Sequence, residues 1–326
     1  MAVHSIEKLR EIIDSEIIKM DFAALRPGEL YMPVSYIMSN GGKRLRPSLT
    51  LMACNLFSDD LLPAIKPAVA IELFHNFTLL HDDIMDKAEM RRGKPTVHKK
   101  WDENTAILSG DAMVVMSFKL ISSTNPDILP SMLSVFNRTA LEVCEGQQLD
   151  INYENMPEVD EAGYLEMIRL KTSVLIAASM SIGAIAGGAS PGDASLLYDS
   201  GMNLGLAFQL QDDLLDLYGS QEEFGKMPGG DILMNKKTYL LIKALEQAND
   251  ETAGKIRSLM ENEKDPHTKI REVTGLFNEL NIKAVTEKKA ETYFNLAIEN
   301  LNLASPVDER KTELTSFIKK VMNRKS

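Results

Sequence analysis

The sequence predicts an all-α protein, and three observations support that prediction. Apolar residues recur at intervals of three and four along most of the chain, the spacing that places them on one face of a helix. The alternation of period two that marks strands is scarce. Short stretches rich in Gly, Pro, Asn, Asp and Ser separate the apolar segments, as in SNGGKRLRP and SSTNPDILPS. We therefore expect a helical bundle of about ten or more helices.

The periodic segments predict the helices in chain order. They cover residues 6–18, 49–57, 67–86, 105–122, 132–152, 164–186, 194–218, 238–247, 270–280, 282–302 and 309–322. Plausible helix starts precede several of them, as in SPGDASLL and NPDILPSML. No long low-complexity linker divides the chain, and no repeat of 20–50 residues is evident. We expect one domain over residues 1–326.

Composition and charge narrow the class of protein. A hydrophobic content of 44% and a charged content of 25% are ordinary for a globular protein. The net charge of −11 argues against nucleic acid and anionic membranes as partners. An anionic substrate would then need a local basic cluster or a metal. Two cysteines make no disulfide framework, and the N-terminus lacks the apolar region of a signal peptide, which favours a cytoplasmic protein.

One uncharged segment bears on membrane insertion. Residues 173–192 carry no charge, and that length could span a bilayer. The segment is rich in Gly, Ala and Ser, which allow neighbouring helices to approach closely, and it ends in a turn. We predict a buried core helix here and no transmembrane segment.

Three aspartates end the segment 67–86 in the pattern DD-x-x-D, at Asp82, Asp83 and Asp86. On a helix, Asp82 and Asp86 point the same way and Asp83 lies beside them. The preceding residues are mainly apolar, so the helix carries these acids into a cavity. Burying unpaired carboxylates is costly, which predicts a bound cation, and oxygen ligands favour Mg²⁺ over zinc.

A second DD-x-x-D ends the segment 194–218, at Asp212, Asp213 and Asp216. Phe208 and Gln209 precede it by one helical turn. One such motif alone is a weak signal, but two, each at the end of an apolar helix, are a strong one. If the two helices face each other, they offer six carboxylates around one cavity.

Basic residues lie in loops near both acidic motifs. Arg91 and Arg92 follow the first motif, Lys226, Lys236 and Lys237 follow the second, and GGKRLRP supplies Lys43, Arg44 and Arg46. Carboxylates with Mg²⁺ on one side and Arg or Lys on the other are what a diphosphate requires. For Arg44 and Lys237 a role as surface charges is at least as well supported. The Gly- or Pro-containing loops favour ligand contact for Lys43, Arg46, Arg91 and Arg92.

These motifs resemble those of the trans-prenyltransferases, the polyprenyl synthetase family of isoprenyl diphosphate synthases. The resemblance rests on GGKRLRP at 41–47, HNFTLLHDDIMDKAEMRRGKPTVH at 75–98, Lys171–Thr172, FQLQDDLLD at 208–216 and GKMPGGDILMNKKTY at 225–239. It implies the isoprenoid synthase-like helical fold around a deep central cavity, and a homodimer. It also implies a condensation of isopentenyl diphosphate with an allylic diphosphate (dimethylallyl, geranyl or farnesyl) that uses three Mg²⁺ ions.

The resemblance implies a role for each matching residue. Asp82 and Asp86 bind Mg²⁺ with Asp83 in support, and Asp212 binds a further ion with Asp213 and the additional ligand Asp216 nearby. Arg91, Lys171, Gln209, Lys226 and Lys236 hold the allylic diphosphate or its reacting end, and Lys43, Arg46, His75 and Arg92 hold isopentenyl diphosphate. The Gln209 amide oxygen, the Thr172 hydroxyl and the Lys171 carbonyl are candidates to stabilise the allylic cation.

The sequence departs from the family pattern at Asn235, where Gly usually precedes the lysine. Asparagine tolerates left-handed backbone conformations better than most residues, so we expect the loop to be preserved. The role of Lys236 depends on that expectation.

The helix before the first acidic motif bears on product length. Phe77 lies five residues before Asp82, about 7–8 Å along the helix axis, and its neighbour Thr78 is small. With no insertion in the first motif, this resembles short-chain synthases that stop near twenty carbons, as in geranylgeranyl diphosphate. Farnesyl diphosphate is the alternative. Phe74, one turn deeper, could form a second floor, and ordinary core packing explains it equally well.

Two other functions share part of this pattern. A class I terpene cyclase shares the helical fold and one DD-x-x-D, but it usually has an Asn/Ser/Glu metal site in place of the second motif. It also lacks the GGKRxxR cluster. A non-catalytic subunit of a prenyl synthase would be expected to lose carboxylates or basic ligands, and all are present here. The expected activity is therefore head-to-tail trans prenyl transfer.

Overall fold

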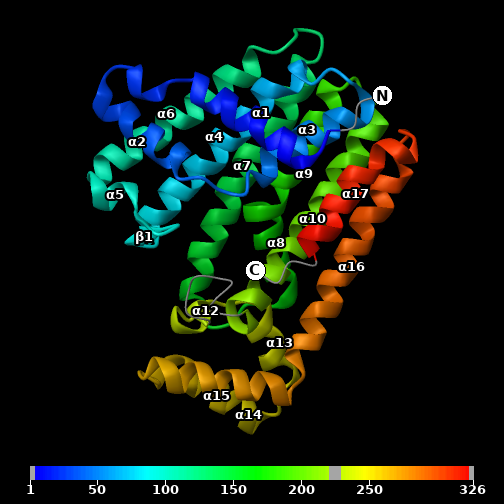
Figure 1. The fold of residues 1–326 in the computed structure, drawn as a ribbon. Coiled ribbons are helices and arrows are strands. Elements are labelled where there is room, and N and C mark those ends of the chain that lie inside the picture. Colours follow the sequence, from blue (N-terminus) through cyan, green and yellow to red (C-terminus); the bar gives the residue numbers. More distant parts are fainter. Residues whose placement is uncertain (1–3, 220–228, 323–326) are drawn as a thin grey trace. The chain divides into compact units, whose positions relative to one another are not determined.

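A computed structural model describes residues 4–219 and 229–322, and the chain divides into two compact units. The first unit is Met1–Arg138, Ala178–Tyr198 and Ala304–Leu314, and the second is Thr139–Ala177, Asp199–Leu303 and Thr315–Ser326. The predicted all-α class is confirmed, because within the described residues the strands are limited to one two-residue pair (Figure 1). The single domain over residues 1–326 stays a prediction.

The first unit is built around α4. Its complete elements are α1 (Ile6–Lys19), η1 (Phe22–Ala24), α2 (Gly28–Ser39), α3 (Leu45–Phe57), α4 (Leu62–Met85), β1 (Met90–Arg91), β2 (Lys94–Pro95), α5 (Val97–Lys100) and α6 (Glu103–Ser122). Parts of α7 (Leu129–Asn155), α9 (Val174–Ala186), α10 (Pro191–Tyr218) and α17 (Asp308–Met322) belong to this unit as well. Helices α1, α2, α3, α5 and α6 all pack against α4 (Figure 1).

The middle of α4 is buried on every side because it is almost entirely apolar. Every side chain from Pro67 to Phe74 is buried, including that of Glu72. The Glu72 carboxylate lies 2.7 Å from Arg44, which also bonds Asp14 and the Met38 carbonyl. Arg44 is only 6% exposed. It is therefore a buried structural cation and not a surface charge.

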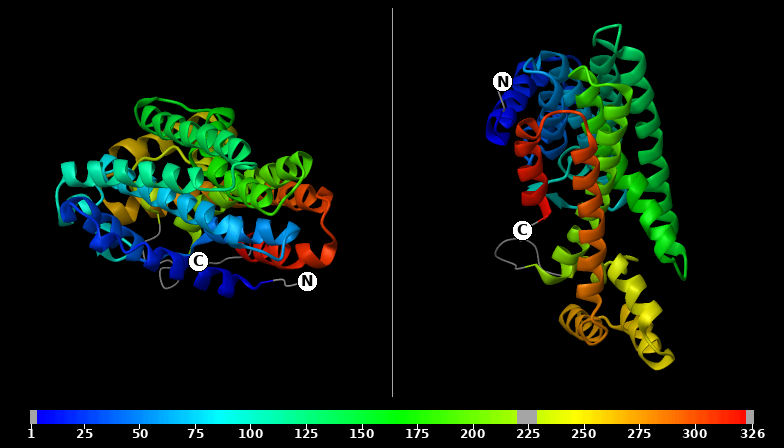
Figure 2. Two further views of the ribbon diagram at one scale, coloured as in Figure 1. Left: turned by 90° about the horizontal axis from the view of Figure 1, so that it is seen from above. Right: turned by 90° about the vertical axis from the view of Figure 1, so that its right-hand side faces the viewer.

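The second unit gathers its short helices at one end of α16. Its complete elements are α8 (Glu161–Ile168), η2 (Arg169–Ser173), α12 (Gly230–Leu233), α13 (Tyr239–Gln247), α14 (Asp250–Asn262), α15 (Pro266–Glu279) and α16 (Ile282–Leu303). Helices α13, α14 and α15 pack on one another, and α13 and α15 also contact α16 (Figure 2). Leu240, Ile256, Val273 and Phe277 belong to the apolar core that joins them.

Two long helices, α2 and α14, were absent from the sequence prediction, as were the four-residue helices α5 and α12. Helix α2 contains Pro33, and helix α14 buries only Ala253, Ile256 and Met260. Such short or proline-interrupted apolar patterns are a weak helical signal, and packing stabilises these helices in the folded protein. The predicted segment 164–186 is also divided by a π-helical turn at Arg169–Ser173.

Within the described residues, two stretches are long and apolar enough to cross a membrane by length and composition alone. These are Glu103–Ile121, which is 33% buried, and Glu161–Ala186, which is 78% buried. The second includes most of the uncharged segment 173–192. Its burial is that of a core helix, as predicted from its small residues.

Candidate active site

The first acidic motif lies at the C-terminal end of α4, and its aspartates differ in exposure. Asp83 is 3% exposed, whereas Asp82 is partly exposed and Asp86 is exposed. The Asp83 carboxylate accepts hydrogen bonds from Arg91, at 2.9 Å from Nε and 2.8 Å from Nη2. Asp83 therefore orients Arg91, and the accessible carboxylates of this motif are those of Asp82 and Asp86.

The β1–β2 hairpin directs two adjacent arginines to different partners. Arg91 lies in β1, while Arg92 and Gly93 form the turn with φ of 51° and 73°. Two positive φ values in succession suit the tight turns that join antiparallel strands. As a result, Arg91 reaches Asp83, whereas Arg92 donates to the backbone carbonyl of Gly41.

Gly42 is needed where the Arg92 guanidinium lies against the loop before α3. Its φ is 139°, and a Cβ atom there would come within 2.8 Å of Arg92 Nη1. A side chain at this position would displace the guanidinium. The paired glycines of GGKRLRP therefore allow Arg92 to approach the loop that carries Lys43, which is exposed.

Arginines surround His75 in this unit. Arg46 Nη1 lies 3.1 Å from His75 Nε2, and a guanidinium can only donate, so Nε2 is the accepting nitrogen. Burial, and then the charges of Arg46, Arg92, Arg91 and Arg44, hold the pKa of His75 well below its usual 6.5. A neutral histidine among guanidinium groups is the electrostatic setting of an anion site.

Aromatic rings pack around the residues predicted to limit product length. Phe74 is 1% exposed and its ring centroid lies 5.3 Å from that of Phe77 and 5.5 Å from that of Phe136. Phe118 lies 5.0 Å from Phe136. Thr78 donates to the His75 carbonyl at 2.8 Å, so its hydroxyl is satisfied by the helix. Phe77 and Phe118 are the partly exposed rings of this group, and Phe77 is the one on α4.

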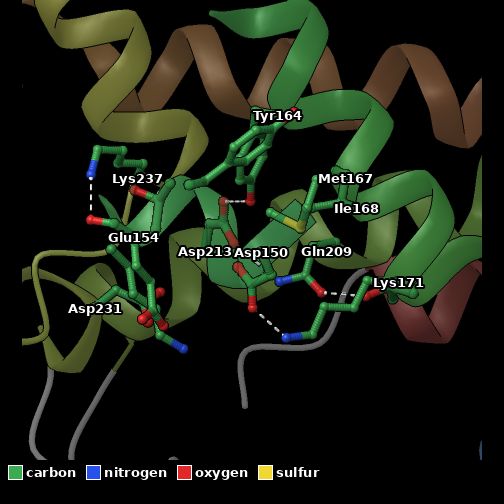
Figure 3. Close-up of a pocket in the computed structure, with 14 residues that line it drawn as sticks. Asp150, Glu154, Tyr164, Met167, Ile168, Lys171, Gln209, Asp213, Asp231 and Lys237 are labelled. Atoms are coloured by element: carbon green, nitrogen blue, oxygen red, sulfur yellow. Dashed lines mark hydrogen bonds and ion pairs between the residues drawn. The ribbon is translucent and has the colours of Figure 1, made fainter. Parts of the chain in front are cut away.

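The second unit contains a cavity of about 200 Å³ (Figure 3). Its lining includes six residues singled out in the sequence, namely Lys171, Thr172, Gln209, Asp213, Lys236 and Lys237, so Lys237 lies at the cavity as well. They come from the π-helical turn, from α10 and from the segment between α12 and α13. Folding therefore brings together residues that are up to 66 positions apart in the chain. The predicted residue Lys226 lies outside the described residues.

A partly buried hydrogen-bond network fixes the Gln209 amide at both ends. Its nitrogen donates to Asp213 at 3.2 Å, and its oxygen accepts from the Thr172 hydroxyl at 3.1 Å. Asp213 also accepts from the Tyr164 hydroxyl, as Figure 3 shows, and from the Tyr239 backbone N–H. Burial raises the pKa of Asp213 to about 7, and the Tyr164 hydrogen bond opposes that rise. Asp213 thus serves as an acceptor that orients Gln209.

The π-helical turn carries Lys171 and Thr172, and two glycines make room for its backbone. A Cβ atom on Gly146 of α7 would lie 2.7 Å from Lys171 Cα, and one on Gly205 of α10 would lie 2.5 Å from Ser173 Cα. π-helical turns inside helices are often found at functional sites. The Lys171 ammonium forms an ion pair with Asp150 at the cavity (Figure 3).

Carboxylates gather where α12 meets the second acidic motif. The Asp231 N–H donates to Asp216 Oδ2 at 3.0 Å, and the Gly229 N–H donates to the Asp216 carbonyl at 2.7 Å. Burial, then the charge of Asp216, with smaller contributions from Asp150 and Asp212, raise the pKa of Asp231 to about 6. Negative charge therefore accumulates here, and a cation would relieve it.

The carboxylates of the acidic motifs suit a metal ion that is bound by protein and substrate together. Within residues 4–219 and 229–322, no group of three or more His, Cys, Asp or Glu side chains is arranged to hold a metal by itself. Mg²⁺ is typically held by one or two carboxylates together with substrate phosphates and water. The carboxylates of each acidic motif are of the kind that this use requires.

Three residues of this site were missed by the sequence analysis. Asp150 and Tyr164 lie outside any local motif, and only the fold brings them to the cavity. Asp231 had a local signal, since it is a further acid within the segment 225–239, fifteen residues after Asp216. Asn235 adopts the left-handed conformation expected of it, with φ of 55°.

Comparisons with known proteins identify the family of this chain. The polyprenyl synthetase family matches residues 27–277. A geranylgeranyl diphosphate synthase of Methanosarcina mazei is 44% identical over 224 residues, 68% of this chain and 69% of that protein. A geranylgeranyl pyrophosphate synthase of Geoglobus acetivorans is 37% identical over 317 residues, 96% of this chain and 94% of that protein.

A solved structure gives the same result for the fold. A crystal structure of a geranylgeranyl pyrophosphate synthase, 44% identical in sequence, matches with a TM-score of 0.94 over 99% of this chain and 100% of that one. The chain belongs to the polyprenyl synthetase family of prenyltransferases.

Proposed function

We propose that this protein condenses isopentenyl diphosphate with an allylic diphosphate, head to tail and in the trans geometry, and that its main product is geranylgeranyl diphosphate. The observation that carries the proposal is the arrangement at the end of α4. Asp82 and Asp86 offer accessible carboxylates at the end of the helix that carries His75, whose pKa is lowered by burial and by nearby guanidinium groups. This combination suits a diphosphate that binds through both metal and fixed cations.

Mg²⁺ is the proposed cofactor, with three ions in the working enzyme. Asp82 and Asp86 would hold ions in the first unit, and Asp212 and Asp216 would do so in the second. The accumulation of carboxylates around Asp231 supports a cation there. When bound, Mg²⁺ neutralises the diphosphate and stabilises the pyrophosphate as it leaves.

Two sets of basic residues are proposed to hold the two substrates. Arg91, Lys171, Lys226 and Lys236 would bind the allylic diphosphate, and Lys43, Arg46, His75 and Arg92 would bind isopentenyl diphosphate. The ion pairs of Arg91 with Asp83 and of Lys171 with Asp150 support this, because each cation is held in one orientation before substrate arrives. His75 acts by accepting from Arg46, which aims that guanidinium.

Gln209 and Thr172 are proposed to stabilise the allylic cation that forms when pyrophosphate leaves. Both line the cavity, and their side chains are hydrogen-bonded to each other. Asp213 holds the amide nitrogen, so the amide dipole is oriented before the reaction and costs little to reorganise. The double bond of isopentenyl diphosphate then attacks the cation, and the proton that is lost goes to the departing pyrophosphate.

The aromatic group below the first motif is proposed to set product length. Phe77 is partly exposed above the buried Phe74, which suits a ring that meets the end of a growing chain. The two relatives named above are geranylgeranyl diphosphate synthases, which favours twenty carbons over the fifteen of farnesyl diphosphate.

A homodimer is proposed from the surface of α6. Ile107, Leu108 and Val115 are 42%, 59% and 67% exposed, although each is apolar. Leu108 and Val115 are seven residues apart and lie on one face of the helix. An apolar stripe of this kind suits a second copy of the chain, and sedimentation of the protein tests it.

The test of the activity is direct. Purified protein is incubated with Mg²⁺, isopentenyl diphosphate and each allylic primer in turn, and the products are sized by chromatography. Asp82→Ala is expected to lose most of kcat, and Asp127→Ala, an exposed aspartate before α7, serves as the control. A cyclic hydrocarbon product, or normal turnover in Asp82→Ala, would contradict the proposal.

A further inference from the structure

The turn after α12 has an asparagine where the backbone is left-handed. Asn235 has φ of 55°, its N–H donates to the Ile232 carbonyl at 3.1 Å, and the Lys236 N–H donates to the Asp231 carbonyl at 2.9 Å. A residue in this conformation commonly ends a helix, and glycine is the usual choice because it has no Cβ. Asparagine tolerates the conformation and adds a side chain that can accept a hydrogen bond.

That side chain is held by a buried lysine. Lys269 of α15 is 5% exposed, and its ammonium donates to Asn235 Oδ1 at 2.6 Å and to the Met260 carbonyl at 2.5 Å. A buried ammonium is costly unless acceptors surround it. Here the acceptors come from the turn after α12 and from α14, so Lys269 ties both to α15.

Helix α12 is therefore attached to its surroundings at both ends. At its start, Asp216 of α10 accepts from the N–H groups of Gly229 and Asp231. At its end, Asn235 accepts from Lys269. Asp231 and Lys236, which both line the cavity, lie between or directly beside these attachments.

We propose that Asn235 is a positioning residue, which acts through Lys269 to hold the turn after α12 and with it the Lys236 ammonium at the cavity. The inference rests on the proposed function, in which Lys236 binds the allylic diphosphate. Glycine at this position would adopt the same φ but would remove one of the two acceptors of the Lys269 ammonium and leave the Met260 carbonyl. Backbone hydrogen bonds would then hold the turn without the Lys269–Asn235 hydrogen bond, which we call the tether.

Three variants separate the tether from the backbone conformation. Asn235→Gly keeps the left-handed φ and removes the acceptor, Asn235→Asp keeps an acceptor for Lys269, and Lys269→Met removes the donor. Asn281→Gly is the matched control, because Asn281 follows α15 with φ of 54° and does not line the cavity. If Lys269→Met fails to fold, Asn235→Gly still decides.

Two measurements are made on each variant of the full-length enzyme. Hydrogen exchange without ligand follows the amides of Asn235 and Lys236, and steady-state kinetics follow KM for the allylic diphosphate separately from kcat. Asn235→Gly should speed exchange at these amides and raise this KM by about tenfold, the scale of one lost charge-assisted hydrogen bond. Asn235→Asp and Asn281→Gly should resemble the wild type in both.

The outcomes distinguish this inference from the proposed function. Unchanged exchange in Asn235→Gly overturns the tether, and faster exchange with an unchanged KM overturns its role in positioning Lys236. In both cases an active wild-type enzyme leaves the proposed function standing. A wild-type enzyme that forms no product defeats the proposed function and the role of Lys236 with it, while the exchange data still decide the tether.

Discussion

Replacing Gly146 with alanine is expected to displace the π-helical turn that carries Lys171 and Thr172. The added Cβ would come closest to Lys171 N, and it would lie 2.7 Å from both Lys171 Cα and the Leu170 carbonyl carbon. Ordinary contacts begin near 3.4 Å, so α7 and the turn must separate by more than about 0.7 Å. All three contacting atoms belong to the backbone, and no flexible side chain can absorb the displacement.

The displacement should affect catalysis more than stability. A misplacement of about 1 Å can cost on the order of 100-fold in rate, so we expect kcat to fall about 10- to 100-fold. Overpacking lowers the unfolding free energy by about 1–3 kcal/mol, and replacing glycine with alanine within a helix raises it by about 1 kcal/mol. The net loss of unfolding free energy should then be at most about 2 kcal/mol, so the variant should fold.

Single-turnover kinetics and denaturant unfolding measure the two effects. Gly275→Ala in α15 is the matched control, because a Cβ there meets no atom within 4 Å. It should leave kcat unchanged and add up to about 1 kcal/mol to the unfolding free energy. A folded Gly146→Ala enzyme whose kcat stays within about twofold of the wild type would refute the reasoning that the turn must be held in this position.

Three further changes test other parts of the site. Below pH of about 6.5 the unfolding free energy should fall, because the unfolded chain is protonated at His75 and the folded chain, with its lowered pKa, is not. In His75→Gln, denaturant titrations should show an unfolding free energy that changes less with pH, by up to about 1.4 kcal/mol per pH unit. Tyr164→Phe should lower the single-turnover rate about tenfold, because the acceptor that orients Gln209 loses a donor. Phe77→Ala should lengthen the product, as sized by chromatography.

Each of these expectations has a result that contradicts it. An unchanged pH dependence in His75→Gln would assign the acid sensitivity to other groups. A normal single-turnover rate in Tyr164→Phe would show that Gln209 needs no such support. An unchanged product spectrum in Phe77→Ala would place the limit on chain length elsewhere.

Features encoded by neighbouring residues were predictable from the sequence. The all-α class follows from apolar spacing, and both DD-x-x-D motifs end helices as expected, at α4 and α10. The left-handed conformation of Asn235 was also predictable, because it depends on that residue's own sterics. Helix α14 was missed because only three of its residues, Ala253, Ile256 and Met260, are buried.

The partners of individual carboxylates depend on contacts across the chain, and no local pattern reveals them. Nothing in the sequence distinguishes the three aspartates within each motif. In the structure, however, Asp83 is buried against Arg91, and Asp213 is buried against Tyr164, which lies 49 residues before Asp213 in the chain. A buried carboxylate must be satisfied by whichever donor the fold brings to it. The sequence by itself determined the helices and the places where acid and base accumulate. The tertiary structure decided which acids are left accessible and which are used to orient Arg91 and Gln209.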